Sequence, residues 1–107
     1  MAHGLHGKNI IGSDRSSTSA NTLRGRNPQT GEDLDPPFFE ASPEEIDRAA
    51  GAAADAARMI RRHSAEERAG LLELMADEIE ALGDDLIDRV VLETGLPEGR
   101  VRGERGR

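Results

Sequence analysis

The sequence predicts a mainly helical chain with short N-terminal β-strands, and it predicts that this chain is an incomplete domain. Residues 1–42 are polar and interrupted by Gly, Ser, Asn and Pro, whereas a helical pattern runs through residues 43–107. Of the 107 residues, 36% are hydrophobic but only 2% are aromatic, and much of the apolar remainder is alanine. Because alanine buries little apolar area, this composition argues against a self-sufficient hydrophobic core.

Residues 1–42 are predicted to form extended strands and turns. The strands are expected at three short apolar pieces, Asn9–Gly12, Asn21–Arg24 and Pro37–Ala41. Between the last two lies Asn27-Pro-Gln-Thr-Gly-Glu32, in which Asn-Pro starts a turn and Gly31 can adopt a positive φ. Residues 13–21 could equally form a mobile loop, since their polar side chains have nothing apolar to pack against.

Two capping boxes mark the starts of the first two helices. Ser42-Pro-Glu-Glu45 offers Ser42 as the N-cap, a proline at the first helical position, and Glu45 to return a bond to the N–H of the cap. Ser64-Ala-Glu-Glu67 repeats the arrangement without the proline. These signatures predict one helix from residue 43 and a second from residue 65.

The predicted helices carry different apolar faces. The face of the first is smooth and shallow, which suits close approach to another element, and consists of Ile46, Ala49, Ala50, Ala53, Ala57 and Ile60. The second helix presents Leu71, Leu72, Met75, Ile79 and Leu82. Gly83 is expected to break it and Asp84 to cap a third helix, which carries Leu86, Ile87, Val90 and Val91. Gly95 would end this third helix, and Pro97 would open a fourth that has barely begun at Arg107.

Charge and composition exclude several classes of function. A formal net charge of -7 argues against a general nucleic-acid binder, because phosphate contacts need a concentrated basic face. With no cysteine, the chain has no disulfide, no thiolate metal site and no cysteine nucleophile. The N-terminus lacks the continuous apolar core of a signal peptide, and no stretch reaches the length of a membrane span. A cytoplasmic protein without membrane or nucleic-acid partners is therefore expected.

The titratable side chains of the sequence have structural explanations. A free amino terminus with His3 could chelate Cu(II) or Ni(II), but removal of Met1 would shift this histidine out of register. His63 is expected to interact with the last carbonyls of the first helix. The acidic pairs lie in first helical turns, where carboxylates complement the helix dipole: Glu44/Glu45, Glu66/Glu67 and Asp84/Asp85.

The serine and glycine clusters do not match a catalytic motif. Ser16, Ser17, Thr18 and Ser19 lack the context of a nucleophile elbow, and Gly103-Glu-Arg-Gly-Arg107 lacks the Lys-Ser/Thr of a phosphate-binding loop. Gly95, Gly99 and Gly103 are four residues apart, which is expected to clear one side of a helix for close packing. The residues thus yield no catalytic residue, no cofactor-binding residue and no metal ligand.

Six short motifs, in this order, resemble the N-terminal region of the aldehyde dehydrogenase superfamily. They extend over nearly the whole chain: Gly7-Lys-Asn-Ile-Ile-Gly12, Asn27-Pro-Gln-Thr-Gly-Glu32, Glu45-Ile-Asp-Arg-Ala-Ala50, Glu67-Arg-Ala69, Met75-Ala-Asp-Glu-Ile-Glu80 and Glu93-Thr-Gly95. Thr94-Gly-Leu-Pro97 with Gly103-Glu-Arg-Gly-Arg107 looks most like the NADP-preferring branch of that superfamily, which oxidises α-ketoglutaric semialdehyde.

The resemblance implies an α/β parent fold in which residues 43–107 are the helical part of an incomplete NAD(P)-binding domain. It also implies a homo-oligomeric parent enzyme that binds NADP or NAD. In that family a cysteine thiolate attacks the aldehyde, hydride passes to NAD(P), and a glutamate-activated water hydrolyses the thioester. The glycine motif, the glutamate and the cysteine all come later in such proteins, and none has a counterpart here.

One family site reaches this region, a structural site for a monovalent cation. By resemblance it corresponds to Gly25, Arg26 and Glu93, but Gly25 offers no side-chain oxygen. Relatives often carry aromatic residues where this chain has Ala57 and Ile60, and the smaller contact area would weaken docking of the first helix.

The leading hypothesis is that the chain is the N-terminal part of an NAD(P)-dependent aldehyde dehydrogenase, either a truncated product or a fragment of a longer reading frame. It would be catalytically inert alone and would need the rest of the enzyme to fold stably. The alternative belongs to a different class: a non-catalytic helical module that docks the alanine-rich first helix and the Leu71 face of the second on a partner or a full-length paralogue.

Overall fold

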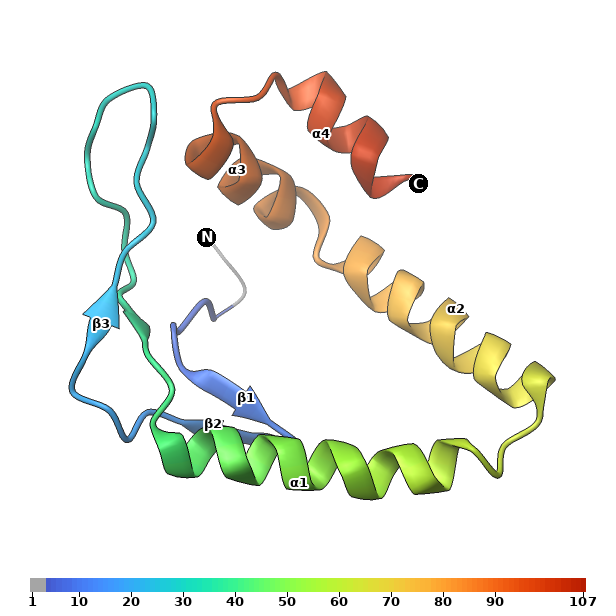
Figure 1. The fold of residues 1–107 in the computed structure, drawn as a ribbon. Coiled ribbons are helices and arrows are strands. Elements are labelled where there is room, and N and C mark those ends of the chain that lie inside the picture. The colour runs from blue at the N-terminus through green and yellow to red at the C-terminus, as the bar shows by residue number, and fades with distance from the viewer. Residues whose placement is uncertain (1–3) are drawn as a thin grey trace.

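The computed structural model describes residues 4–107 and shows four short strands followed by four helices, arranged as an open arc (Figure 1). The strands are β1 (Asn9–Ile11), β2 (Asp14–Ser16), β3 (Thr22–Leu23) and β4 (Phe38–Phe39). The helices are α1 (Pro43–Ile60), α2 (Ala65–Ala81), α3 (Gly83–Thr94) and α4 (Glu98–Arg105). The described chain is mainly helical with a few short strands, as predicted.

The strands form two separate antiparallel pairs. In one, β1 pairs with β2 and Asn9 lies opposite Ser16; in the other, β3 pairs with β4 and Thr22 lies opposite Phe39. Strands occupy all three predicted positions, but the interpretation of residues 13–21 as a mobile loop is wrong, because β2 lies within them. The Ser16 hydroxyl of this segment donates to the Glu45 carboxylate of α1, so a polar contact holds the segment and apolar packing is not needed.

The loop between β3 and β4 folds back on itself. The Gly31 amide donates to the Asn27 carbonyl at 2.8 Å, and Gly31 has the expected positive φ of 78°. An isolated bridge joins Arg26 and Asp33 further from the tip. Residues 24–35 therefore form a closed, ordered turn, which we call the Gly25 loop. Figure 1 shows it beside α3.

Helices α1 and α2 start as predicted. The side chains of Ser42 and Ser64 each accept from a backbone amide three residues on, and both reciprocal glutamate bonds are present. Gly95 ends α3 with a φ of 68°, also as predicted. The prediction that Asp84 caps α3 is wrong, since α3 has no side-chain cap and Asp84 lies inside its first turn. The fourth helix extends for eight residues instead of barely beginning.

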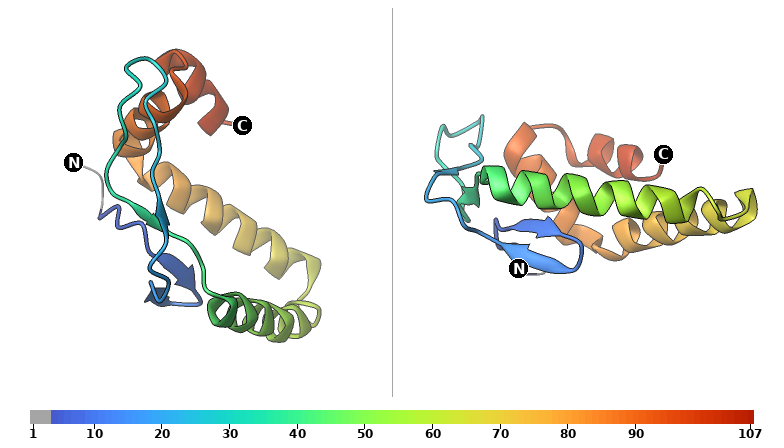
Figure 2. Two further views of the ribbon diagram at one scale, coloured as in Figure 1. Left: turned by 60° about the vertical axis from the view of Figure 1, so that its left-hand side comes forward. Right: turned by 60° about the horizontal axis from the view of Figure 1, so that its bottom comes forward.

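The arc encloses little hydrophobic core. Its radius of gyration is 16.8 Å, against about 13 Å for a compact chain of this length. Its accessible surface is 8136 Å², against about 5,800 Å² for a compact monomer of this mass. Among the described residues, the buried hydrophobic side chains are Ile87 of α3 and Val101 of α4. Figure 2 shows β1 and β2 against α1, while α2 stands apart from the strands.

None of the helices in residues 4–107 combines the length and the hydropathy that would let it cross a lipid bilayer.

Candidate functional site

The strongest polar centre of the described chain is the Glu45 carboxylate, at the start of α1. This side chain is 2% exposed, and it returns the capping bond to the Ser42 amide at 2.9 Å. It also accepts from the Ser16 hydroxyl and from the Thr18 amide, the latter at 3.2 Å. One carboxylate therefore caps α1 and attaches the segment that contains β2 to it.

The environment of Glu45 stabilises its ionised form. The hydrogen bond from the Ser16 hydroxyl has the largest effect and that from the Ser42 amide the next largest. They lower the pKa of Glu45 from its ordinary value of 4.5 to about 2 and outweigh the opposing effect of burial. A carboxyl group with so low a pKa is a poor proton donor or acceptor near neutral pH. Glu45 is thus a structural anion, as its place in a capping box predicted.

The Gly25 loop meets α3 through a second polar centre, Arg89. Its Nε donates to Glu93 Oε1 at 2.7 Å, and its Nη1 donates to the carbonyl oxygen of Asp35. A methyl group added at Gly25 would lie 3.1 Å from Glu93 Oε1 and 3.5 Å from Arg89 Nη2. The structure therefore brings two of the three predicted cation-site residues together, Gly25 and Glu93, with an arginine beside them.

The third predicted cation-site residue points elsewhere. Arg26 forms an ion pair with Asp33 at 3.3 Å inside the Gly25 loop, and its side chain is 69% exposed. Arg89 was not singled out from the sequence, although Arg89 and Glu93 are four residues apart, a spacing that favours an ion pair on a helix. That spacing is the signal that could have found it.

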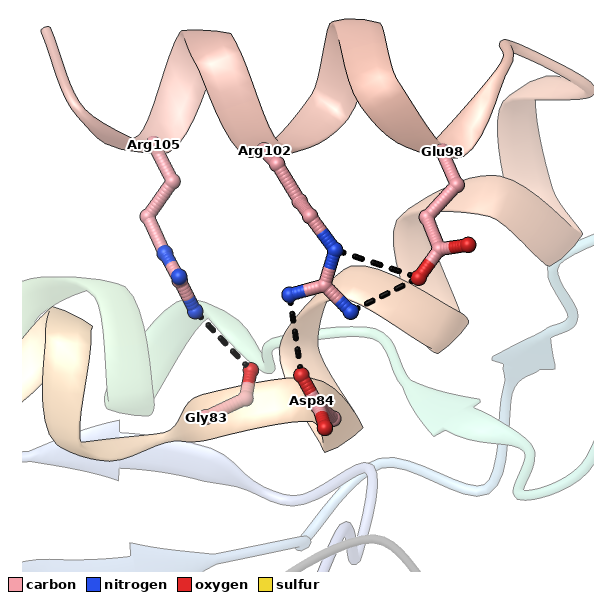
Figure 3. Close-up of polar contacts among 5 residues, drawn as sticks. All are labelled: Gly83, Asp84, Glu98, Arg102 and Arg105. Atoms are coloured by element: carbon pink, nitrogen blue, oxygen red, sulfur yellow. Dashed lines mark hydrogen bonds and ion pairs between the residues drawn. The ribbon is translucent and has the colours of Figure 1, made fainter.

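Helices α3 and α4 pack as a hairpin with a polar seam (Figure 3). Arg102 lies between two carboxylates, 3.0 Å from Asp84 and 2.7 Å from Glu98, and these bonds raise its pKa. Arg105 donates to the carbonyl oxygen of Gly83 at 3.4 Å. Ile87 and Val101 are buried on these same two helices. The seam therefore joins α3 and α4 by charged contacts as well as by apolar ones.

An apolar groove of about 600 Å³ lies at the corner where α1 passes into α2. It is lined by Ile60, His63, Glu67, Arg68, Gly70, Leu71 and Leu74. The neighbouring apolar side chains of α2 are also open to solvent; Leu72, for example, is 66% exposed. The faces predicted to pack against other elements are thus uncovered in the described chain.

Other sequence predictions meet different outcomes. His3 lies outside the described residues. The His63 amide donates to the carbonyl of Ile60, the last residue of α1, at 3.1 Å, whereas the His63 side chain faces Glu67 at 3.8 Å and Arg61 donates to the Ala57 carbonyl. Among the described residues, nothing lies within 4 Å of a methyl group at Gly99 or Gly103, so the close packing expected at these glycines stays a prediction.

No group of three or more His, Cys, Asp or Glu side chains within residues 4–107 could hold a metal ion. Two of the first-turn carboxylates, Glu45 and Glu67, serve the helices through their capping boxes. What the arrangement can do is hold segments together through Glu45, Arg89 and Arg102 and present apolar helix faces to other surfaces.

Comparison with known proteins gives a consistent match. Residues 15–107 match the aldehyde dehydrogenase family. The chain is similar to alpha-ketoglutaric semialdehyde dehydrogenase 2 of Azospirillum brasilense, with 46% identity over 104 residues, which cover 96% of this chain and 20% of that protein. It is also similar to alpha-ketoglutaric semialdehyde dehydrogenase of Acinetobacter baylyi, with 34% identity over 102 residues, which cover 95% of this chain and 19% of that protein. The chain spans about a fifth of the length of these curated relatives.

Proposed function

Because this chain belongs to the aldehyde dehydrogenase family, we infer that its function is that of the N-terminal part of an NAD(P)-dependent oxidoreductase that converts an aldehyde to a carboxylate. The observation that carries this inference is the match along nearly the whole chain to relatives of which it spans about a fifth. Both relatives are named for α-ketoglutaric semialdehyde, which supports that aldehyde as the substrate of the parent enzyme. NADP is the cofactor that the resemblance to their branch favours.

The part played by this chain in that reaction is structural. The family reaction needs a thiolate to attack the aldehyde, and the chain has no cysteine. Its most perturbed carboxyl, Glu45, has a pKa lowered to about 2, the opposite of what a base working near neutral pH requires. The absence of cysteine assigns the nucleophile of the parent enzyme to other residues, and the family resemblance implies the same for the general base and the cofactor site.

The open arc supports this assignment. Residues 1–42 supply strands and turns, and residues 43–107 supply the helical part of an NAD(P)-binding domain. The α2 face and the groove at Leu71 and Leu74 would be covered by the rest of that enzyme, since large uncovered apolar surface is costly in water. A cytoplasmic homo-oligomer is the form of the parent enzyme that the family resemblance supports. The family match gives these faces an occupant, and no observation favours a separate docking module.

The test is an assay of the purified chain for reduction of NADP and of NAD with α-ketoglutaric semialdehyde, with the Azospirillum brasilense relative as the positive control. We expect reduced cofactor from the relative and none from this chain. Aldehyde-dependent turnover that copurifies with this chain would overturn the structural role. A chain that neither turns over nor binds either cofactor in equilibrium dialysis would meet the expectation in full.

A further inference from the structure

The contact between the Gly25 loop and α3 is unusually close at its two ends. Gly25 lies against Glu93, as the 3.1 Å separation of an added methyl group from Glu93 Oε1 shows. At the other end, a methyl group on Gly95 would lie 3.3 Å from Pro28. The loop and the C-terminal end of α3 are therefore in direct contact.

The residues at this contact do not fit a monovalent cation. Gly25 has only its backbone carbonyl to offer, and that oxygen already accepts from the Leu34 amide at 2.8 Å. Arg26 is itself a cation and is paired with Asp33. Glu93 is the one carboxylate of the set, and its Oε1 is engaged by Arg89 at 2.7 Å. A metal ion placed here would face a guanidinium and would have few free oxygens to bind.

The Arg89 guanidinium places a positive charge beside Gly25 and Glu93, where a bound cation would lie. Its side chain is 18% exposed, and it donates from Nε to Glu93 and from Nη1 to the Asp35 carbonyl, so it joins α3 to the base of the loop, where the Leu34 amide donates to Gly25. Its Nη2 is buried, has no hydrogen-bond partner among the described residues, and faces the space over Gly25. The positive charge thus lies between the carboxylate of the helix and the backbone of the loop.

We propose that the Arg89 guanidinium is a built-in cation that holds the Gly25 loop to α3 and takes the place of a bound Na⁺ or K⁺ at Gly25 and Glu93. The loop is consequently insensitive to the identity of the monovalent cation in solution. The proposal rests on the contacts of Arg89 and is independent of the reaction catalysed by the parent enzyme.

The experiment is amide hydrogen exchange on the full 107-residue chain, read at the Leu34 and Gly31 amides of the loop. These are compared in NaCl, KCl and tetramethylammonium chloride at equal ionic strength. We expect the three rates to agree within about twofold, because a built-in charge does not depend on the salt cation. Protection that rises specifically in Na⁺ or K⁺ would overturn the proposal. Loop amides that exchange like an unfolded peptide in every salt would overturn it too, since Arg89 would then hold nothing.

Variants separate the charge of Arg89 from general effects of mutation. Arg89→Gln should raise loop exchange by about tenfold, and Arg89→Lys by less, because lysine keeps the charge but loses the fork of donors. Low concentrations of guanidinium chloride should partly restore protection in Arg89→Gln. The matched control is Arg26→Gln, an exposed arginine of the same loop, which should change little. If Arg89→Gln behaves like Arg26→Gln, the proposal fails; if it unfolds the chain as a whole, the salt series on the unmodified chain decides.

Discussion

Glu45 and Thr18 are joined across the boundary between the strand region and α1, where the Thr18 amide donates to Glu45 Oε1 at 3.2 Å. The same carboxylate accepts from Ser16 of β2 and closes the capping box with Ser42. Glu67 forms an equivalent box with Ser64 at the start of α2, but it is exposed, and within residues 4–107 it binds no strand residue. The two glutamates therefore form a matched pair in which only one attaches a distant segment.

Replacement of Glu45 by alanine should release the β1–β2 hairpin from α1, whereas replacement of Glu67 should affect only the first turn of α2. The reason is that Glu45→Ala leaves the Thr18 amide and the Ser16 hydroxyl without their buried anionic acceptor. We expect amide exchange in β1 and β2 to rise by about tenfold or more in Glu45→Ala and to stay unchanged in Glu67→Ala. Equal effects of the two substitutions on the hairpin would contradict this assignment.

Attachment of the hairpin should also depend on pH in the acid range. The folded pKa of Glu45 is lowered from 4.5 to about 2, so its stabilising effect is complete above pH 4.5 and is lost as the pH falls through about 2. Two-dimensional NMR between neutral pH and pH 2 should show β1–β2 resonances change in that window in the unmodified chain. In Glu45→Gln this pH-dependent change of the β1–β2 resonances should be absent. If the change persists in that variant, the transition belongs to another titratable group.

Gly7 should tolerate substitution much less well than Gly12. Both have a positive φ, so alanine at either position incurs about 1–2 kcal/mol of backbone strain. At Gly12 no described residue lies within 4 Å of the added methyl group, whereas at Gly7 the methyl group would lie 1.9 Å from the carbonyl oxygen of Pro37. Gly7→Ala should therefore disrupt the contact in which the Phe39 amide donates to the Gly7 carbonyl at 2.9 Å. The exchange rate of the Phe39 amide in the two variants measures this difference.

Truncation of an apolar side chain should lower the stability of this chain more in α3 than in α2. Ile87 is fully buried between helices, so Ile87→Ala should cost about 2–5 kcal/mol and open the α3–α4 hairpin. Ile79 of α2 is 48% exposed, and Ile79→Ala should change stability by less than about 0.5 kcal/mol. Urea unfolding followed by circular dichroism gives both values. In a longer protein whose remaining residues cover α2, the cost of Ile79→Ala should rise well above the value for this chain alone.

Local signals in the sequence predicted the helices better than the contacts between segments. Each capping box is formed by two residues only three positions apart, Ser42 with Glu45 and Ser64 with Glu67. Both helix starts could therefore be predicted from local sequence. The second role of Glu45 was not, because its bonds to Ser16 and Thr18 span 29 and 27 residues and leave no periodic pattern. Asp84 shows the converse error. Aspartate is a residue type that often caps a helix, but in this fold Asp84 forms an ion pair with Arg102 of α4.

The candidate cation site illustrates the same limit. Gly25 and Glu93 were paired by family resemblance, and the structure does place them together. Their chemistry depends on Arg89, whose guanidinium reaches both α3 and the carbonyl of Asp35, 54 residues away in sequence. Such a contact is decided by tertiary packing, which the charge pattern of one helix cannot specify.

The most direct measurement for the central claim is the activity of a chimera in which this chain replaces the matching segment of the Azospirillum brasilense relative. The quantity is kcat/KM for cofactor-dependent oxidation of α-ketoglutaric semialdehyde. If this chain is the structural N-terminal part of such an enzyme, the chimera should retain activity within about tenfold of the relative. A chimera that folds and binds cofactor but does not oxidise the aldehyde would contradict the account.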